Sequence, residues 1–130
     1  MVRPSMAPAP SGRPGRHQND HLAEHLPALR EALELQRTFR REQLAQLGAQ
    51  DRTDAHSPQA HGEDAASAHR EVHSLLIAGA RRALADIDVA LARMAAGAYG
   101  RCRACAADIP LQLLTAIPST TLCLDCRQGT

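Results

Sequence analysis

The sequence has very few aromatic residues and no lysine. Aromatic side chains make up 2% of its 130 residues, with one Phe, one Tyr and no Trp. Without large aromatic side chains a wide globular core is unfavourable, and an elongated helical architecture rich in Ala and Leu fits the composition better. All 15 basic residues are arginines, and 14 acidic residues nearly balance them. This balance disfavours binding to nucleic acid or an anionic membrane through bulk charge.

Long apolar runs are also missing. The longest such stretch, 75–80, is far shorter than the roughly 20 residues that a membrane helix needs. The N-terminal segment has Arg3 but no apolar run behind it, so no secretory signal is expected. We therefore expect a cytoplasmic protein with no membrane partner, in a compartment where thiols stay reduced.

The four cysteines are grouped into two pairs. Cys102 and Cys105 form one CxxC pair, Cys123 and Cys126 form the other, and 17 residues separate the pairs. Each CxxC can present two thiolates to one ion, and the loop between the pairs is long enough to complete a tetrahedron. Four thiolates leave no coordination position for water, so the spacing predicts one structural Zn²⁺ and not a catalytic one.

Other uses of the cysteines fit less well. Two disulfides would need an oxidising compartment, and a thioredoxin-like motif would need one CxxC beside a βαβ unit. Two alternative functions stay open for a zinc finger: an interaction module for nucleic acid or protein, and a thiol redox sensor that ejects zinc on oxidation. The first needs a basic or aromatic surface, whereas acids at 108 and 125 offset Arg101, Arg103 and Arg127. No catalytic triad, phosphate loop or carboxylate pair indicates an enzyme.

Two stretches before the cysteines have helical periodicity. The first runs from His21 or Pro27 to Leu47, with leucines at 22, 26, 29 and 33 and Pro27 suited to a first turn. The second runs from about 63 to 96 and has a heptad seam. The seam residues are Ile77, Ala80, Leu84, Ile87, Leu91 and Met94. Helix-breaking glycine and proline residues at 48–63 predict that the chain reverses direction there, so the two helices should fold back on each other.

The predicted fold class is mainly α, an antiparallel helical hairpin (coiled coil) followed by a small four-cysteine zinc finger. Residues 1–20, rich in Pro and Gly, predict a disordered tail. The hairpin is expected over 21–97 with its tip near 48–66, and the finger over 98–130. Within the finger, 109–116 is expected to form a short helix with Pro110 at its first turn. The sequence leaves open whether the seam pairs within one chain or between two.

Two histidine pairs have a spacing that can chelate a metal. His21 and His25, like His69 and His73, lie four residues apart on helical stretches. Neither pair has an evident third ligand, so polar surface is the preferred interpretation. His73 also falls on the backward extension of the heptad seam, where it could form a polar layer that fixes register.

The residues around the cysteines form a wider pattern. They are Gly97, Ala98, Tyr99, Gly100, the two cysteine pairs, and Ile109, Leu114, Ala116 and Pro118 between the pairs. This pattern, over the C-terminal third of the chain, resembles the DksA/TraR family of bacterial transcription regulators. Ala106 stands where that family usually has Gly, and Leu113 stands where it often has Arg. No counterpart of the family's helix after the finger is expected.

The resemblance implies a protein that binds RNA polymerase directly and recognises no DNA sequence. Family members insert the helical hairpin into the secondary channel of the polymerase, with acidic residues at the tip close to the catalytic centre. They alter the lifetime of promoter complexes, in some cases together with guanosine tetraphosphate. The resemblance also implies that the four cysteines hold the family's zinc ion.

Active members of this family have an Asp-x-x-Asp-x-Ala sequence at the tip. Two segments of the chain match it in part. Asp51 and Asp54 keep both acids without the Ala, whereas Asp64 and Ala66 keep the second acid and the Ala. The distance back from Cys102 favours the second segment, so Asp64 is the preferred effector residue.

Overall fold

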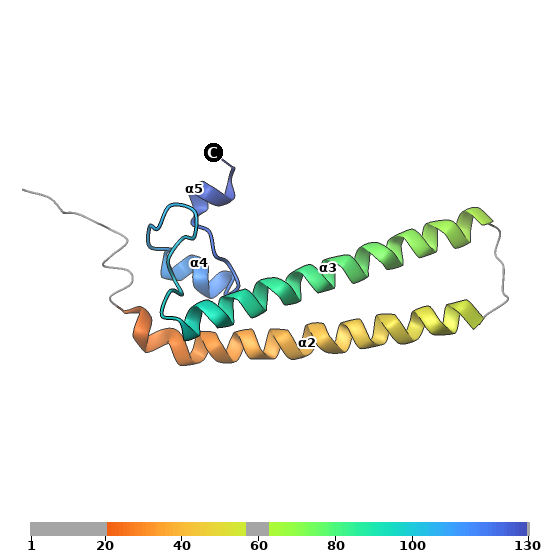
Figure 1. Cartoon of the computed structure of the whole chain (residues 1–130), viewed down its shortest axis with the longest axis horizontal. Coiled ribbons are helices and arrows are strands. Elements are labelled where there is room, and N and C mark those ends of the chain that lie inside the picture. Colours follow the sequence, from red (N-terminus) through yellow and green to blue (C-terminus); the bar gives the residue numbers. More distant parts are fainter. Residues whose placement is uncertain (1–20, 57–62, 130) are drawn as a thin grey trace, which may run out of the picture. The chain divides into compact units, whose positions relative to one another are not determined.

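The protein is mainly helical in the computed structural model, which describes residues 21–56 and 63–129 (Figure 1). For residues 51–56 and 63 the backbone alone is described. The helices are α2 (Leu22–His56), α3 (Glu63–Ala95), α4 (Leu111–Ala116) and α5 (Leu124–Arg127). Over the described ranges, β pairing is limited to an isolated bridge between Arg101 and Asp108. The predicted tail at 1–20 lies outside the described residues.

Helix α2 is longer than its sequence signals predict. It begins at Leu22, so Pro27 lies inside the helix and not in its first turn. The expected end at Leu47 is wrong, because the helix continues through Gly48 to His56. A single Gly in a helix costs only about 1 kcal/mol relative to Ala, and the neighbours of Gly48 are good helix formers. The second helix is close to its expected range of about 63–96, since α3 runs over Glu63–Ala95.

The chain divides into two compact units. One contains the described residues up to Leu33 and those from Val89 onward, and the other contains Glu34–Asp88. Both long helices therefore contribute to both units. The boundary is of interest because the cysteines all lie in the first unit and the candidate tip residues all lie in the second.

In the unit Glu34–Asp88, the two helical segments run antiparallel (Figure 1). The heptad seam of α3 is confirmed, because Ala80 and Ile87 are buried and Ile77 and Leu84 are half-buried. His73 extends the same seam and is also buried. Its ring stacks on that of His69, with the two ring centroids 6.3 Å apart. This burial agrees with the polar layer expected at that position.

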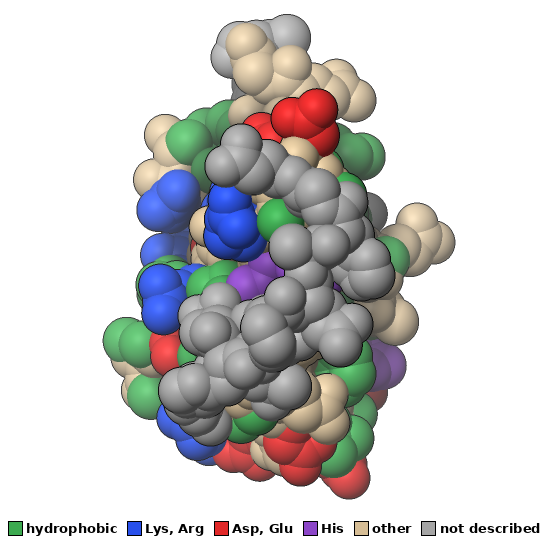
Figure 2. Space-filling view, turned by 90° about the vertical axis from the view of Figure 1, so that its right-hand side faces the viewer, with side chains coloured by type: hydrophobic (Ala, Val, Ile, Leu, Met, Phe, Trp, Pro, Cys, Tyr) green, Lys and Arg blue, Asp and Glu red, His purple; other side chains and the backbone are tan. Residues whose placement is uncertain are grey.

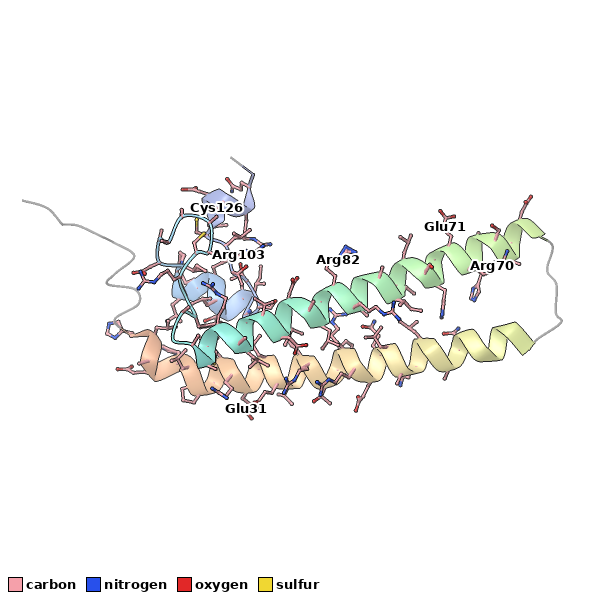
Figure 3. The ribbon with its side chains drawn as sticks, viewed as in Figure 1. Glu31, Arg70, Glu71, Arg82, Arg103 and Cys126 are labelled. Atoms are coloured by element: carbon pink, nitrogen blue, oxygen red, sulfur yellow. The ribbon has the colours of Figure 1, made fainter. Side chains whose placement is uncertain are left out.

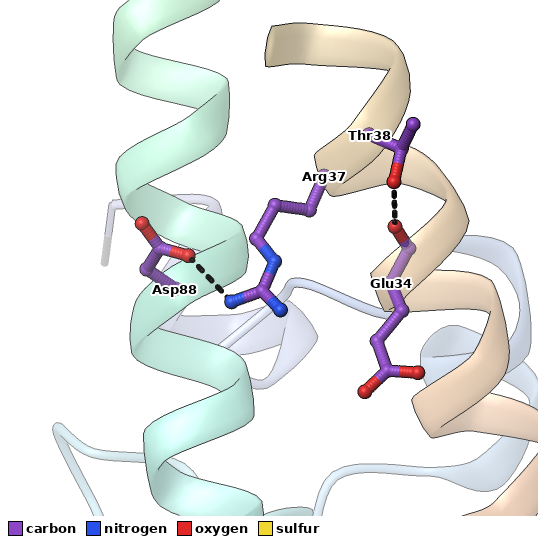
Figure 4. A network of polar contacts seen from close by, with 4 residues as sticks. All are labelled: Glu34, Arg37, Thr38 and Asp88. Carbon is purple, nitrogen blue, oxygen red and sulfur yellow. Dashed lines mark hydrogen bonds and ion pairs between the residues drawn. The ribbon is translucent and has the colours of Figure 1, made fainter.

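Among the side chains that the structure describes, an ion pair joins the two helical segments of this unit. An Nη1 atom of Arg37 on α2 lies 3.6 Å from Oδ1 of Asp88 on α3 (Figure 4). Beside it, the Thr38 hydroxyl donates a hydrogen bond to the Glu34 carbonyl oxygen at 3.1 Å. Both charged side chains are partly exposed, so the pair contributes at most about 1 kcal/mol and mainly favours this register.

The first unit buries apolar side chains from both long helices and from the finger. On α2 and α3 they are Leu22, Leu29, Leu33, Ala90 and Met94. In the finger they are Tyr99, Cys102, Ile109 and Leu114. Leu33, Ile109 and Leu114 are fully buried. Three leucines of the stripe expected on the first helix, Leu22, Leu29 and Leu33, therefore lie in the core of this unit.

None of the helices in the described ranges combines the length and the apolar character that crossing a membrane requires.

Candidate metal centre

The first cysteine pair follows directly from the end of α3. Gly97 has φ 78°, and backbone N–H groups at 97 and 98 donate to the carbonyls of Met94 and Arg93. This left-handed glycine closes the helix and turns the chain toward the finger. The Arg93 guanidinium also donates to the backbone oxygens of residues 98 and 101. An Arg in the last helical turn before a Gly is a sequence signal of such capping that we did not use.

The backbone of the first knuckle is held by short hydrogen bonds. The Cys102 N–H donates to the Ala107 carbonyl at 2.7 Å, and the Ala106 N–H donates back to the Cys102 carbonyl at 2.8 Å. The Ile109 N–H donates to the Gly100 carbonyl at 2.7 Å. These bonds fold 100–109 back on itself, so that Cys102 is buried and Cys105 remains exposed.

Ala106 has an unusual backbone conformation. Its φ is 67°, and it is the only non-glycine residue with positive φ in the described chain. A side chain at such a position costs roughly 1–2 kcal/mol, and glycine avoids that cost. This is the position at which the DksA/TraR pattern usually has Gly. The departure therefore places local strain in the turn that follows Cys105.

The second cysteine pair lies at the start of a short helix that the sequence did not predict. Cys123 is the N-cap of α5, Cys126 lies within it, and the Arg127 N–H donates to the Cys123 carbonyl at 2.9 Å. Thr120 is buried, and its hydroxyl bonds to the backbone oxygen and N–H of Leu122. These contacts position the second knuckle. The expected short helix between the pairs is present as α4, but it begins at Leu111, so Pro110 is its N-cap and does not lie in its first turn.

A backbone contact joins the two knuckles. The N–H of Arg103, between the first two cysteines, donates to the Thr121 carbonyl at 2.9 Å. As a result the four Sγ atoms lie within 4.8 Å of one another, and those of Cys105 and Cys123 are 3.7 Å apart. A tetrahedral Zn²⁺ with Zn–S bonds of about 2.3 Å has S–S edges of about 3.8 Å. The cluster therefore fits one zinc ion.

The same distances disagree with a disulfide interpretation. All four cysteines are free, whereas a disulfide requires its sulfurs at about 2.05 Å. The four thiols are thus arranged as the corners of one site. In the part of the chain that the structure describes, the four cysteines are the only group of three or more potential metal ligands that lie close together. Neither histidine pair has a third ligand there.

The thiols differ in how readily they lose a proton. Burial works to raise the pKa of Cys102, but hydrogen bonds from the backbone N–H groups of Cys123, Cys105 and Ala104 lower it to about 6. The pKa of Cys126 is raised to about 12, chiefly because its thiol shares hydrogen bonds with the thiols of Cys123, Cys102 and Cys105. One negative charge on the cluster thus disfavours the next. A divalent cation removes this conflict, because it takes the place of the shared protons.

The candidate tip residues are described unequally. Asp64 lies exposed in the first turn of α3 and Ala66 is half-buried. Asp51 and Asp54 belong to the last turns of α2, where the backbone alone is described. Figure 2, turned by 90° from the view of Figure 1, shows acidic, arginine and apolar side chains exposed on one face of the molecule. Asp64 is therefore the candidate acid whose side chain the structure describes.

The fold and the thiol cluster define a mainly helical protein with a C-terminal C4-type zinc finger. Residues 97–130 match the family model described as the prokaryotic dksA/traR C4-type zinc finger, and the four-thiol cluster within this segment fits one zinc ion. No curated protein matches the sequence with statistical significance.

A solved structure has the same fold over most of the chain. Transcription factor DksA2 from Pseudomonas aeruginosa superposes with a TM-score of 0.70 at 24% sequence identity. The match covers 78% of this chain and 79% of that chain. The likeness establishes the shared fold, and it extends beyond the finger into the helices.

Tyr99 supports the finger and provides a pH-dependent signal. Its buried hydroxyl donates to the Pro118 carbonyl at 2.8 Å, and burial raises the pKa of Tyr99 to about 12. We expect tyrosinate absorbance to appear with a midpoint near pH 12 in the folded protein and near pH 10 in denaturant. Because folding favours the neutral phenol, the contribution of Tyr99 to the free energy of unfolding is intact below pH 10. It falls by about 1.4 kcal/mol per pH unit between pH 10 and 12.

Ultraviolet titration checks this directly, since the chain has one Tyr and no Trp. Tyr99→Phe should abolish the signal and lower the free energy of unfolding by roughly 1–3 kcal/mol, because the buried Pro118 carbonyl loses its donor. A midpoint near pH 10 in the folded protein would show that the phenol is exposed.

Proposed function

We propose that this protein is a zinc-binding transcription regulator that binds RNA polymerase directly, with its helical hairpin entering the secondary channel. The observation that carries the proposal is the coincidence of a dksA/traR finger at 97–130 with a fold shared with a transcription factor over 78% of the chain. Two independent comparisons thus agree on one class of protein. The proposed activity is non-enzymatic.

In this proposal Cys102, Cys105, Cys123 and Cys126 are the zinc ligands. Their sulfurs lie within 4.8 Å of one another, and four thiolates complete a tetrahedron without leaving a place for water. Bound zinc supplies structural stabilisation. The chain's own contribution is the backbone network that holds the two knuckles together, including the Arg103 N–H bond to the Thr121 carbonyl.

The effector end of the proposed regulator is the tip near 48–66. Asp64 is its main residue, with Ala66 beside it and Asp51 and Asp54 as the second acidic segment. Asp64 is exposed at the start of α3, so its carboxylate is accessible to a partner. A carboxylate there could act on the magnesium ions or basic residues of a polymerase catalytic centre, whereas DNA would be repelled by it.

Asp64→Asn removes this charge at nearly constant volume. We expect the variant to bind RNA polymerase within about threefold of wild type, because a single exposed charge contributes little to affinity. Its effect on promoter-complex lifetime should be lost. In vitro transcription with purified protein, with and without guanosine tetraphosphate, measures the effect, and a pull-down measures binding.

Glu42→Gln is the matched control, since it removes one exposed carboxylate from α2. That variant should behave as wild type in both measurements. Absence of any association with RNA polymerase, under conditions in which a DksA protein binds, would overturn the proposed function. An Asp64→Asn variant with full activity would overturn the assignment of Asp64 alone.

A further inference from the structure

Helix α3 has a second heptad pattern on the side away from its core seam. It consists of Ala68, Glu71, Leu75, Ala78, Arg82 and Ala85, here called the outer stripe, with spacing 3-4-3-4-3. From Glu71 to Ala85 each member precedes a seam residue by two positions, which is about 200° around the helix. All six residues are exposed. Figure 3 shows Glu71 and Arg82 projecting from the side of α3 opposite α2.

The outer stripe and its edge expose an unusual amount of apolar surface. Leu75 is 66% exposed, and Val72, one turn before it, is 55% exposed. Leu76 is 49% exposed and lies about 100° around the helix from Leu75, next to Val72. A Cβ atom added at Gly79 would meet nothing within 4 Å, so the surface next to Leu75 is open. Three large apolar side chains within two helical turns form a patch of the kind that marks an interaction site.

The two charges of the outer stripe complement each other when two copies of the helix pack antiparallel. Glu71 lies toward the N-terminal end and Arg82 toward the C-terminal end, 11 residues apart, or about 16 Å along the helix. They are too far apart to pair within one helix. Among the described residues neither takes part in an ion pair of its own chain. A helix with the reverse order of charges would satisfy both, and an antiparallel copy of α3 has that order.

We propose that the outer stripe is a self-association surface, on which α3 of a second copy of this chain packs antiparallel. With the two-fold axis between positions 75 and 78, Glu71 of each copy lies beside Arg82 of the other. Leu75 then lies beside Ala78, and Ala68 beside Ala85. A two-fold axis makes each contact occur twice, which gives two ion pairs around a central apolar layer. The proposal does not depend on the proposed function.

The small side chains of the outer stripe suit this arrangement. Ala68, Ala78 and Ala85 permit close approach of two helices, since the interaxial distance depends on the side chains at the contact. The interface is a single helix pair and is therefore smaller than a standard interface of about 1,600 Å². We accordingly expect a dissociation constant on the order of 10 to 100 μM.

Sedimentation velocity of the full-length, zinc-loaded protein from micromolar to millimolar concentration tests the proposal. Wild type should pass from monomer to dimer across this range. Glu71→Arg and Arg82→Glu should each raise the dissociation constant about tenfold or more, because each places two like-charge pairs in the interface. An equimolar mixture of the two variants should dimerise as wild type does, since every opposed pair is then complementary. The double variant Glu71→Arg with Arg82→Glu should also regain dimerisation.

Glu42→Arg and Arg41→Glu are matched controls, since they reverse exposed charges on α2. They should leave association unchanged, and circular dichroism should show equal helicity for all variants. A wild type that stays monomeric at millimolar concentration would overturn the proposal and assign the exposed face to a different protein. Failure of both the mixture and the double variant to restore dimerisation would equally overturn it.

Discussion

Replacing Cys102 by serine is expected to release the zinc ion and unfold the finger. Cys102 is buried with 2% exposure, and backbone hydrogen bonds lower the pKa of its thiol to about 6. Structural zinc contributes about 10–16 kcal/mol to the folding of small zinc modules. A serine hydroxyl is a poor substitute for a thiolate, so we expect zinc affinity to fall about a hundredfold or more.

The measurement is zinc content and thermal unfolding of Cys102→Ser beside Ala104→Ser. Ala104 is exposed and lies between the first two cysteines, so the control adds the same hydroxyl to the same knuckle without removing a sulfur. The control should retain one zinc and the wild-type unfolding temperature. Equal zinc affinity in the two variants would exclude Cys102 as a ligand.

Leu33→Ala is expected to lower the free energy of unfolding by about 2–5 kcal/mol. Leu33 has 0% exposure and lies in the unit that also contains the finger. Ala is an even better helix former than Leu, so the loss reflects packing and not helix propensity. Urea unfolding followed by circular dichroism measures the change.

Leu35→Ala is the matched control two residues further along α2. Leu35 is 66% exposed, so the same truncation should change stability by less than about 0.5 kcal/mol. A similar loss for both variants would mean that the buried side of α2 has been misassigned. Nearly equal stability of Leu33→Ala and wild type would contradict the core described for this unit.

The parts of the fold that could be predicted from the sequence depend on periodicity. Burial of Leu29, Leu33, Ala80, Ile87 and Met94 follows from apolar residues repeating at helical spacing. The metal centre followed in the same way from the spacing of the two CxxC pairs. Both signals are regular patterns that only one local structure satisfies.

The errors concern the limits of the first helix. Pro27, expected in a first turn, lies inside α2, and Gly48, expected among the residues that end the helix, does not end it. A proline or glycine changes helix stability by a few kcal/mol at most, and tertiary packing along a 35-residue helix outweighs that. Local breakers are therefore weaker evidence than a sustained pattern on both sides of them.

Other features could not be read from the sequence because they depend on tertiary contacts. Helix α5 contains four residues, too few for a periodic signal. Its position is set by Cys123 at its N-cap and by the hydroxyl network of Thr120. The positive φ of Ala106 was foreshadowed only by its departure from the DksA/TraR pattern, since composition alone never predicts a left-handed alanine.

The central claim is that the four cysteines form a single zinc site, and metal analysis of protein purified under reducing conditions tests it most directly. We predict one zinc per chain, with all four thiols protected from a thiol reagent until a chelator removes the metal. Protein that is folded, contains zinc at well below one per chain and has four reactive thiols would contradict the account.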